Sequence, residues 1–249
     1  MNKIIRPHGS LINLFSSNNG NGDFDPLTYD ANTVALWDGN DAESGASGTW
    51  VDKVGGYVLA NGRNGASVSY PTRVSGGING HNYLQMDENG AYISYAQCAL
   101  PVRSQPSTQY LVVGSNSHIG NRYWFDDGVV ATRNTIRCAA PSPNISYTNA
   151  GTGVTGITEC TLTQFFIITI VKAVGVDASS ITIDQGTPKT FTMTGGGVDD
   201  AGYTLNASTG LITFTSIESK WAYIIARDGA DDTDTQKLFV DFLKARFAL

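Results

Sequence analysis

The sequence predicts an all-β fold, a β-sandwich with one α-helix at its C-terminal end. The 249 residues include 28 glycines and six Asn-Gly dipeptides. Asn-Gly suits the tight turns of β-hairpins, because both central residues of such turns need a positive φ angle. Charged residues make up only 15% of the chain, and aspartate, an acid common in turns, outnumbers glutamate by 18 to four. Helical proteins usually carry more Glu, Lys and Leu, so the composition favours strands joined by turns.

The first 26 residues are expected to form an arm outside the main core. Residues 1–15 could make one β-strand, and residues 16–22 (SSNNGNG) have the composition of a flexible linker. The alternative is that this first strand belongs to the sandwich itself. The sequence therefore predicts an N-terminal arm and linker over residues 1–26 and one jelly-roll domain over residues 27–249.

Residues 34–56 are the most informative segment of the chain. A short apolar strand ends at Trp37 and is followed by Asp38 and Asp41, and a Gly/Ser loop then leads to the isolated Trp50. Aromatic residues at strand ends, with carboxylates beside the loops, suit a β-sandwich whose rim contacts a partner. The segment indicates architecture more firmly than activity.

Strands alternate with turns from residue 24 onward. The candidate strands are apolar or alternating runs bounded by turn residues. They are Thr33–Trp37, Tyr57–Ala60, Tyr83–Met86, Tyr92–Tyr95, Gln109–Gly114, Tyr123–Phe125, Phe165–Val171, Ser180–Ile183, Thr190–Thr194, Leu211–Phe214 and Trp221–Ala226. The run Phe165–Val171, interrupted only by Thr169, is apolar on both faces and is expected to be a central strand.

The C-terminal segment carries the helical pattern. Thr233 and Gln236 have the spacing of a capping box, and several aspartates lie near the expected N-terminus of the helix. Apolar residues then recur at helical spacing, namely Leu238, Phe239, Phe242, Leu243 and Phe247. Lys237 and Asp241 are four residues apart, as in a helical ion pair. The sequence predicts one amphipathic helix that docks on the sandwich, with the Phe242 ring buried against the sheet.

Charge and hydropathy argue against several classes of partner. The formal net charge is −6, the pI is near 4.9 and the basic residues are scattered, which argues against nucleic acid. The longest apolar run is too short to cross a membrane, and the first 15 residues lack the apolar stretch of a signal peptide. Cys98, Cys138 and Cys160 show no C-x-x-C spacing and favour free thiols from a reducing compartment, with one bridge plus a spare thiol left open. We expect synthesis in a cytoplasm.

Four segments together resemble one family. They are residues 24–27 leading into 36–41 (FDPL and LWDGND), 50–56 (WVDKVGG), 181–186 (ITIDQG), and 221–225 (WAYII) running into the terminal helix. This pattern resembles the concanavalin A-like (laminin G-like) jelly-roll superfamily, in the form found in tailed-phage virion and bacterial surface proteins. The resemblance spans roughly residues 24–249. It implies a jelly roll of the kind used by lectins, glycan-binding modules, glycosidases and structural virion domains, so fold alone does not choose the function.

The carboxylates offer two kinds of candidate site. Glycosidases on this scaffold use closely spaced acids on one strand, and none of the four glutamates has such a partner, so we expect no enzyme. Asp38, Asp41 and Asp52 could gather at one rim and bind Ca²⁺, which needs several oxygen ligands. The alternative is that these three are turn residues. A second acidic group, Asp228, Asp231, Asp232 and Asp234, has the alternative of a helix cap.

Four aromatic residues are candidates for stacking on sugar rings: Trp50, Tyr57, Tyr123 and Trp124. For each of them the alternative is packing in the core. Trp37 and Trp221 lie within apolar strands and are expected to be core residues.

The favoured functional hypothesis is a non-enzymatic bacteriophage virion structural protein, of the capsid-decoration or head-fibre type, that displays a lectin-like jelly roll. Its arm would contact other virion proteins, its sandwich could bind host surface glycans, and several copies or a homo-oligomer would sit on the particle. No cofactor is expected, with Ca²⁺ as the one candidate. The alternative is a carbohydrate-binding adhesin or tail-fibre module, and the third hypothesis is a glycoside hydrolase.

Overall fold

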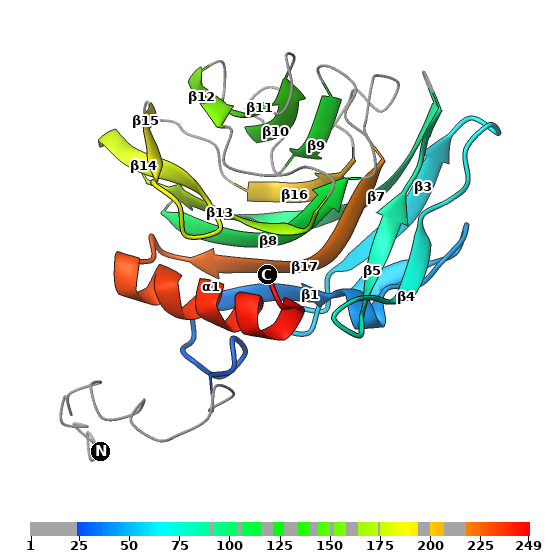
Figure 1. Ribbon diagram of the computed structural model, residues 1–249, viewed down its shortest axis with the longest axis horizontal. Coiled ribbons are helices and arrows are strands. Elements are labelled where there is room, and N and C mark those ends of the chain that lie inside the picture. Colours follow the sequence, from blue (N-terminus) through cyan, green and yellow to red (C-terminus); the bar gives the residue numbers. More distant parts are fainter. Residues whose placement is uncertain are drawn as a thin grey trace.

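The computed structural model shows two antiparallel sheets and the helix α1 (Thr233–Phe247), which lies across the outer face of one sheet (Figure 1). It describes residues 24–89, 92–103, 106–115, 122–126, 134–139, 144–149, 152–157, 164–173, 175–193, 200–206 and 218–249. The expected all-β jelly-roll sandwich with one C-terminal helix is confirmed.

The first sheet carries the helix. Its strands are β1 (Thr33–Asp38), β4 (Thr72–Ile78), β5 (His81–Met86), β8 (Ser107–Ser115), β13 (Phe166–Lys172), β14 (Gly175–Ile183), β15 (Lys189–Met193) and β17 (Ser219–Asp228). Neighbouring strands follow the order β15–β14–β13–β8–β17–β5–β4, and β1 also pairs with β17. The strand predicted over Phe165–Val171 is β13, and it lies inside the sheet between β8 and β14 as expected.

The second sheet covers the opposite face of the first. Its strands are β2 (Thr49–Val51), β3 (Val58–Asn64), β6 (Glu88–Asn89), β7 (Tyr92–Arg103), β9 (Arg122–Asp126), β10 (Asn134–Ala139), β11 (Asn144–Asn149), β12 (Thr152–Ile157) and β16 (Asp200–Leu205). They follow the order β12–β11–β10–β9–β16–β7–β3–β2, with β6 paired to β7. A 3-10 turn, η2 (Gly39–Asp41), follows β1. The strand predicted over Leu211–Phe214 lies outside the described residues.

Two apolar cores hold these layers together. The core between the sheets includes Trp37 and Trp221, as the sequence predicts, and both side chains are buried. It also contains Cys98, a free thiol whose pKa burial raises to about 11, so this thiol stays protonated at neutral pH. The second core lies between the first sheet and α1, where residues of alternate strand positions meet Phe239 and Leu243. The first sheet is therefore buried on both faces, which explains its long apolar runs.

The helix begins one residue earlier than an N-cap at Thr233 would require. Asp232 is the N-cap, and its carboxylate accepts a hydrogen bond from the Thr235 N–H at 2.8 Å. Hydrogen bonds donated by Thr235 lower the pKa of Asp232. The predicted capping box from Thr233 to Gln236 is therefore wrong, since Gln236 instead donates through Nε2 to the Asp231 carbonyl. The alternative of a helix cap holds for Asp232 in the second acidic group.

The buried face of α1 also differs from the predicted set. Phe239, Leu243 and Phe247 are buried as expected, and Val240 joins them. Leu238 and Phe242 are only half-buried, and Phe242 packs at the edge of the core under the helix, so the prediction of a buried Phe242 ring holds only in part.

The described chain begins with residues that already belong to the core. The Phe24 ring packs edge-on against Phe239 at 5.0 Å between centroids, and it also contacts Tyr29 and Phe242. Thr33 Oγ1 donates to the Pro26 carbonyl at 2.8 Å, which ties the following turn to β1. Packing of the sandwich and helix thus extends to residue 24, and the rest of the predicted arm lies outside the described residues.

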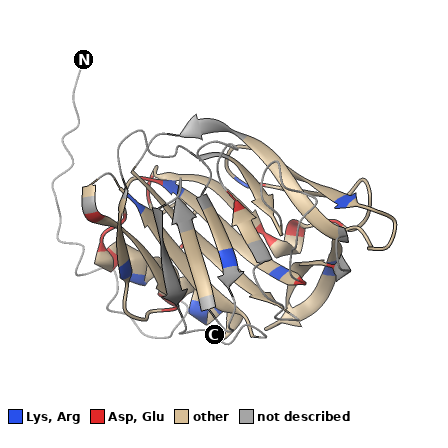
Figure 2. Ribbon diagram, turned by 90° about the horizontal axis from the view of Figure 1, so that it is seen from above, with Lys and Arg blue, Asp and Glu red and all other residues tan. Residues whose placement is uncertain are grey.

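Acidic and basic residues of the described chain are interspersed along its strands and loops (Figure 2). Within the described ranges, no helix is both long and apolar enough to span a membrane.

Candidate functional site

The carboxylates of Asp38 and Asp41, predicted to form an acidic rim, are not free. They form ion pairs with Lys53 and Arg246, and we call these four residues the clasp. Asp38 accepts from the Asn40 N–H at 3.0 Å and so caps η2. Lys53 Nζ lies 3.2 Å from Asp38 Oδ2 and 3.1 Å from Asp41 Oδ2, and Arg246 Nη2 lies 2.7 Å from Asp38 Oδ2. Burial lowers the pKa of Lys53, but hydrogen bonds and charge from the two aspartates outweigh it and raise the pKa overall. The clasp joins the loop after β1 to the last turn of α1.

Asp52 organises the turn between β2 and β3. Its buried carboxylate accepts four backbone N–H groups, from Leu36 at 2.9 Å, Val54 at 2.7 Å, Gly55 at 2.9 Å and Tyr57 at 2.8 Å. In the described part of the chain, no group of three or more His, Cys, Asp or Glu side chains is placed to hold a metal ion. The structure therefore does not gather Asp38, Asp41 and Asp52 into a Ca²⁺ site, because cations and backbone amides already engage the carboxylates of Asp38 and Asp52.

Asp52→Ala is expected to lower the free energy of unfolding by about 2 kcal/mol, because buried N–H groups lose their acceptor and water replaces it only in part. Asp41→Ala, which removes a more exposed partner of Lys53, is the matched control and should cost less than about 0.5 kcal/mol. Urea denaturation measures both values. Excess EDTA and excess Ca²⁺ are each expected to leave the Tm of the unmodified protein unchanged, whereas a rise in Tm with Ca²⁺ would restore the metal hypothesis.

Two of the four predicted sugar platforms are core residues. Trp50 and Trp124 are fully buried between the sheets, so neither indole offers a face to a sugar. The Trp50 Nε1–H donates to the Asp38 carbonyl at 2.6 Å, which fixes the ring against the loop after β1. Tyr57 is partly buried and packs against the same core, and the side chain of Tyr123 lies outside the described residues. The prediction that Trp50 and Trp124 stack on sugars is wrong.

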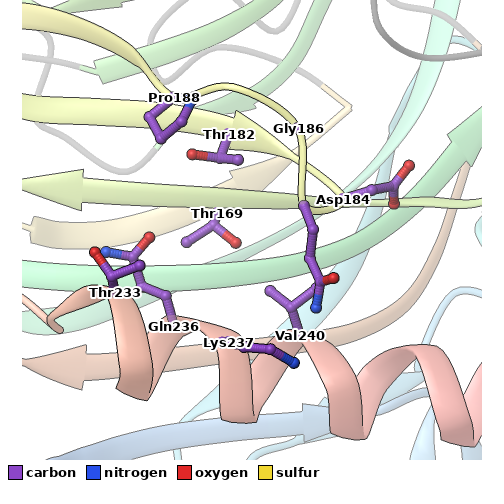
Figure 3. A pocket seen from close by; sticks show the side chains of 10 residues that line it. Thr169, Thr182, Asp184, Gly186, Pro188, Thr233, Gln236, Lys237 and Val240 are labelled. Carbon is purple, nitrogen blue, oxygen red and sulfur yellow. The ribbon is translucent and has the colours of Figure 1, made fainter.

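A cavity of about 240 Å³ lies instead between α1 and the outer face of β13 and β14 (Figure 3). Its floor is formed by the two strands, one wall by the loop from Asp184 to Pro188, and the other wall by the first turns of α1. The lining comprises Thr169, Thr182, Asp184, Gln185, Gly186, Pro188, Thr233, Gln236, Lys237 and Val240. The core under α1 includes Ile167 of β13, so the cavity borders that core on the side of β14.

Two threonines form the floor of this cavity. Thr169 on β13 is paired in register with Thr182 on β14, so their side chains share the outer face of the sheet. Thr169 is 2% exposed and Thr182 is 8% exposed. Neither Oγ1 atom has a hydrogen-bond partner among the described residues. Each Oγ1 is itself almost inaccessible, so other atoms of these two side chains line the cavity. Buried hydroxyl groups in folded proteins are nearly always paired, so two unpaired ones beside one cavity are unusual.

The walls of the cavity carry both charges and amides. Asp184 has a φ of +53° and its Oδ1 accepts from the Ile167 N–H at 2.9 Å, which holds the start of the loop against β13. On the helix side Lys237 forms an ion pair with Asp241, and Gln185 Nε2 donates to the same carboxylate. These contacts connect the loop to the helix beside the cavity. The arrangement can offer hydroxyl and amide hydrogen bonds to a small polar molecule.

None of these cavity residues was among the predicted site residues. The signal was present in the strands, because Thr169 interrupts an otherwise apolar run and Thr182 stands between two isoleucines. A polar residue inside a strand that is buried on both faces must meet a partner, a water or a ligand. The strand pattern could not show that α1 forms one wall of the cavity, because the helix is distant in sequence from β13 and β14.

Searches of protein-family models and of curated proteins give no match for the chain. Solved structures do match its fold. A botulinum neurotoxin type C chain, from a toxin whose cell entry depends on interaction with two ganglioside molecules, has a TM-score of 0.58 at 11% identity over 81% of this chain and 50% of that one. A Trypanosoma rangeli sialidase in complex with sialic acid has a TM-score of 0.57 at 12% identity over 86% and 33%.

A third match is a single domain. Domain 4 of AbnA, a GH43 extracellular arabinanase from Geobacillus stearothermophilus, in complex with arabinotriose, has a TM-score of 0.58 at 12% identity. The match covers 83% of this chain and 98% of that domain, whereas the chain spans only about half of the neurotoxin chain. The chain therefore has the β-sandwich fold of these structures. At such low identity the likeness shows the fold alone and assigns no site.

Proposed function

We propose that this chain is a non-enzymatic carbohydrate-binding module carried on the particle of a tailed phage, as a capsid-decoration or head-fibre protein. The observation that carries the glycan-binding part is the whole-domain likeness to an arabinanase domain in complex with arabinotriose. The match covers 83% of this chain and 98% of that domain, so the likeness concerns nearly the whole of that domain.

The chemistry of the described cavity supports binding rather than hydrolysis. Its described lining contains the carboxylate of Asp184, whereas glycoside hydrolysis in most families uses a pair of carboxyl groups about 5–10 Å apart. Hydroxyl and amide groups form most of its polar lining, and these groups bind sugars without transferring a proton to the glycosidic oxygen.

Glycan binding is tested with the purified protein on a panel of neutral and acidic saccharides, by isothermal titration calorimetry. Saturable binding of at least one saccharide, with no release of reducing sugar on prolonged incubation, is the expected result. Failure of every saccharide to bind would overturn the carbohydrate-binding function, and release of reducing sugar would make the protein an enzyme.

The virion part of the proposal comes from the sequence resemblance and from the linker-like composition of residues 16–22. Deleting residues 1–22 is expected to leave the Tm nearly unchanged while the truncated protein no longer co-sediments with phage particles. The matched control is deletion of residues 1–26, which also removes the Phe24 ring from its contact with Phe239 and should lower the Tm. Co-sedimentation of the shorter deletion at the level of the full chain would contradict attachment through the arm.

A further inference from the structure

We propose that the cavity between α1 and the β13–β14 pair is the sugar-binding site and that it binds one uncharged sugar unit. Thr169 and Thr182 form hydrogen bonds with the hydroxyl groups of that sugar. This inference rests on the proposed carbohydrate-binding function. It differs from the rim of aromatic residues considered from the sequence, since the site lies on the outer face of the first sheet, under the helix (Figure 3).

The threonine pair is the main reason for placing a ligand here. Residues directly opposite each other on antiparallel strands have Cβ atoms about 4.5–5.5 Å apart. Hydrogen bonds between hydroxyl groups span about 2.8 Å. Each Oγ1 is covered in the structure described, and a change of χ1 rotamer, which exchanges the positions of the hydroxyl and the methyl group, would turn it toward the cavity. One ligand hydroxyl placed between Thr169 and Thr182 would then donate to one Oγ1 and accept from the other. Such a ligand would give both buried hydroxyls the partner that the described protein does not supply.

The size of the cavity fits a single sugar unit. At about 240 Å³ it falls below the range of roughly 300–1,000 Å³ typical of pockets for drug-sized molecules. Most of the accessible surface that lines the cavity is apolar, and a smaller part is polar. A sugar ring presents both C–H groups and hydroxyls, so it matches a cavity that combines these surfaces.

The charges around the cavity favour an uncharged ligand. Its described lining holds one carboxylate, Asp184, and one ammonium, Lys237, and Asp241 already pairs with that ammonium. An acidic sugar would bring its carboxylate close to Asp184 and Asp241 without an unpaired cation to receive it. Neutral saccharides are therefore expected to bind more tightly than sialic acid.

The test replaces each floor threonine by valine, which has nearly the same shape and a high strand propensity but no hydroxyl. Calorimetric titration with arabinotriose, galactose, glucose and N-acetylglucosamine, and with sialic acid as the acidic probe, measures affinity. Thr169→Val and Thr182→Val are expected to weaken binding of the neutral saccharide at least tenfold, while Thr182→Ser, which keeps the hydroxyl, retains it. Thr190→Val, on the exposed face of β15, is the matched control and should bind like the unmodified protein.

Stability measured without sugar gives an independent readout. Because removing an unpaired buried hydroxyl relieves its desolvation penalty, both valine variants should show a Tm equal to or above that of the unmodified protein. A marked fall in Tm, or failure to fold, would show that these hydroxyls have partners and would overturn the site. Unchanged sugar affinity in both valine variants would also overturn the site while leaving the carbohydrate-binding function intact. Sialic acid binding as tightly as the neutral sugars would overturn the uncharged class, and no binding to the unmodified protein would overturn the function itself.

Discussion

Phe239→Ala is expected to lower the free energy of unfolding by about 3–5 kcal/mol, the range for truncating a fully buried phenylalanine. Phe239 is fully buried, and its ring stacks on Tyr110 with 4.8 Å between centroids and an interplanar angle of 12°. Phe24 and Tyr29 approach the same ring edge-on, and the Arg227 guanidinium lies 4.3 Å from its centroid. Alanine would leave a cavity that these rigid neighbours cannot fill.

Phe242→Ala is the matched control on the same helix. Its ring is half-buried, so water can occupy much of the vacated space and a cost of about 1–2 kcal/mol is expected. Chemical denaturation of both variants, with unchanged m-values, provides the comparison. Equal costs for the two substitutions would mean that α1 docks through a different face from the one described.

The helix shows what periodicity can predict. Spacing alone places Phe239, Leu243 and Phe247 on one face, and all three are buried. Spacing cannot tell which residues at the edge of that face are buried. The predicted set therefore includes Phe242, which is half-buried, and lacks Val240, which is buried. The choice between them depends on where β8, β13 and β17 lie beneath the helix, which is a property of sheet topology rather than of the local sequence.

The strands follow the same pattern. Long apolar runs such as β8, β13 and β17 were predicted with nearly correct bounds, because both faces of these strands are buried. The strands β4, β10, β11, β12 and β16 were not predicted. In β4, for example, most positions are exposed and two glycines interrupt it, so neither alternation nor apolar content marks it as a strand. This segment forms a strand because it pairs with β5, and the local sequence gives no sign of that pairing.

The candidate site was less predictable than the fold. The sequence pattern of Trp50 and the nearby aspartates is conspicuous, but it does not mark a binding site. In the structure the Trp50 indole is buried and the aspartates form ion pairs and hydrogen bonds within turns. The cavity depends on two strands, a loop and a helix that meet only in three dimensions. Its sequence signal is limited to Thr169, which interrupts an otherwise apolar run, and to Thr182, which stands between two isoleucines.

Arg227→Met is expected to lower the free energy of unfolding by about 3–5 kcal/mol, because it removes one partner of a buried charge network. The Arg227 side chain is 1% exposed. Its Nε lies 2.7 Å from Asp231 Oδ2, and its Nη2 lies 2.8 Å from Asp30 Oδ2. Tyr110 also donates to Asp231 at 2.8 Å. The network connects the turn before β1, the sheet and the start of α1, and methionine would leave the Asp231 carboxylate buried without its cation.

Acid titration gives this prediction a second readout. Partial burial raises the pKa of Asp30, but hydrogen bonds from Arg227 and Asn32 and the charge of Arg227 outweigh it, so the pKa of Asp30 lies below its ordinary value. A lowered pKa contributes stability that is present above about pH 4, the ordinary value for aspartate, and is lost as pH falls through the folded-state pKa. The difference in stability between Arg227→Met and the unmodified protein should therefore be full at neutral pH and shrink below about pH 4.

Lys237→Met is the control for this experiment, because Lys237 forms an exposed ion pair within α1. Exposed pairs contribute little, so its cost should stay below about 1 kcal/mol. Arg227→Lys keeps a positive charge but cannot reach both aspartates with a planar fork of donors, so its cost should fall between those of the two methionine variants. If Arg227→Met cost no more than Lys237→Met, the network would contribute specificity rather than stability, and the docking of α1 would depend on Phe239 and its aromatic neighbours alone.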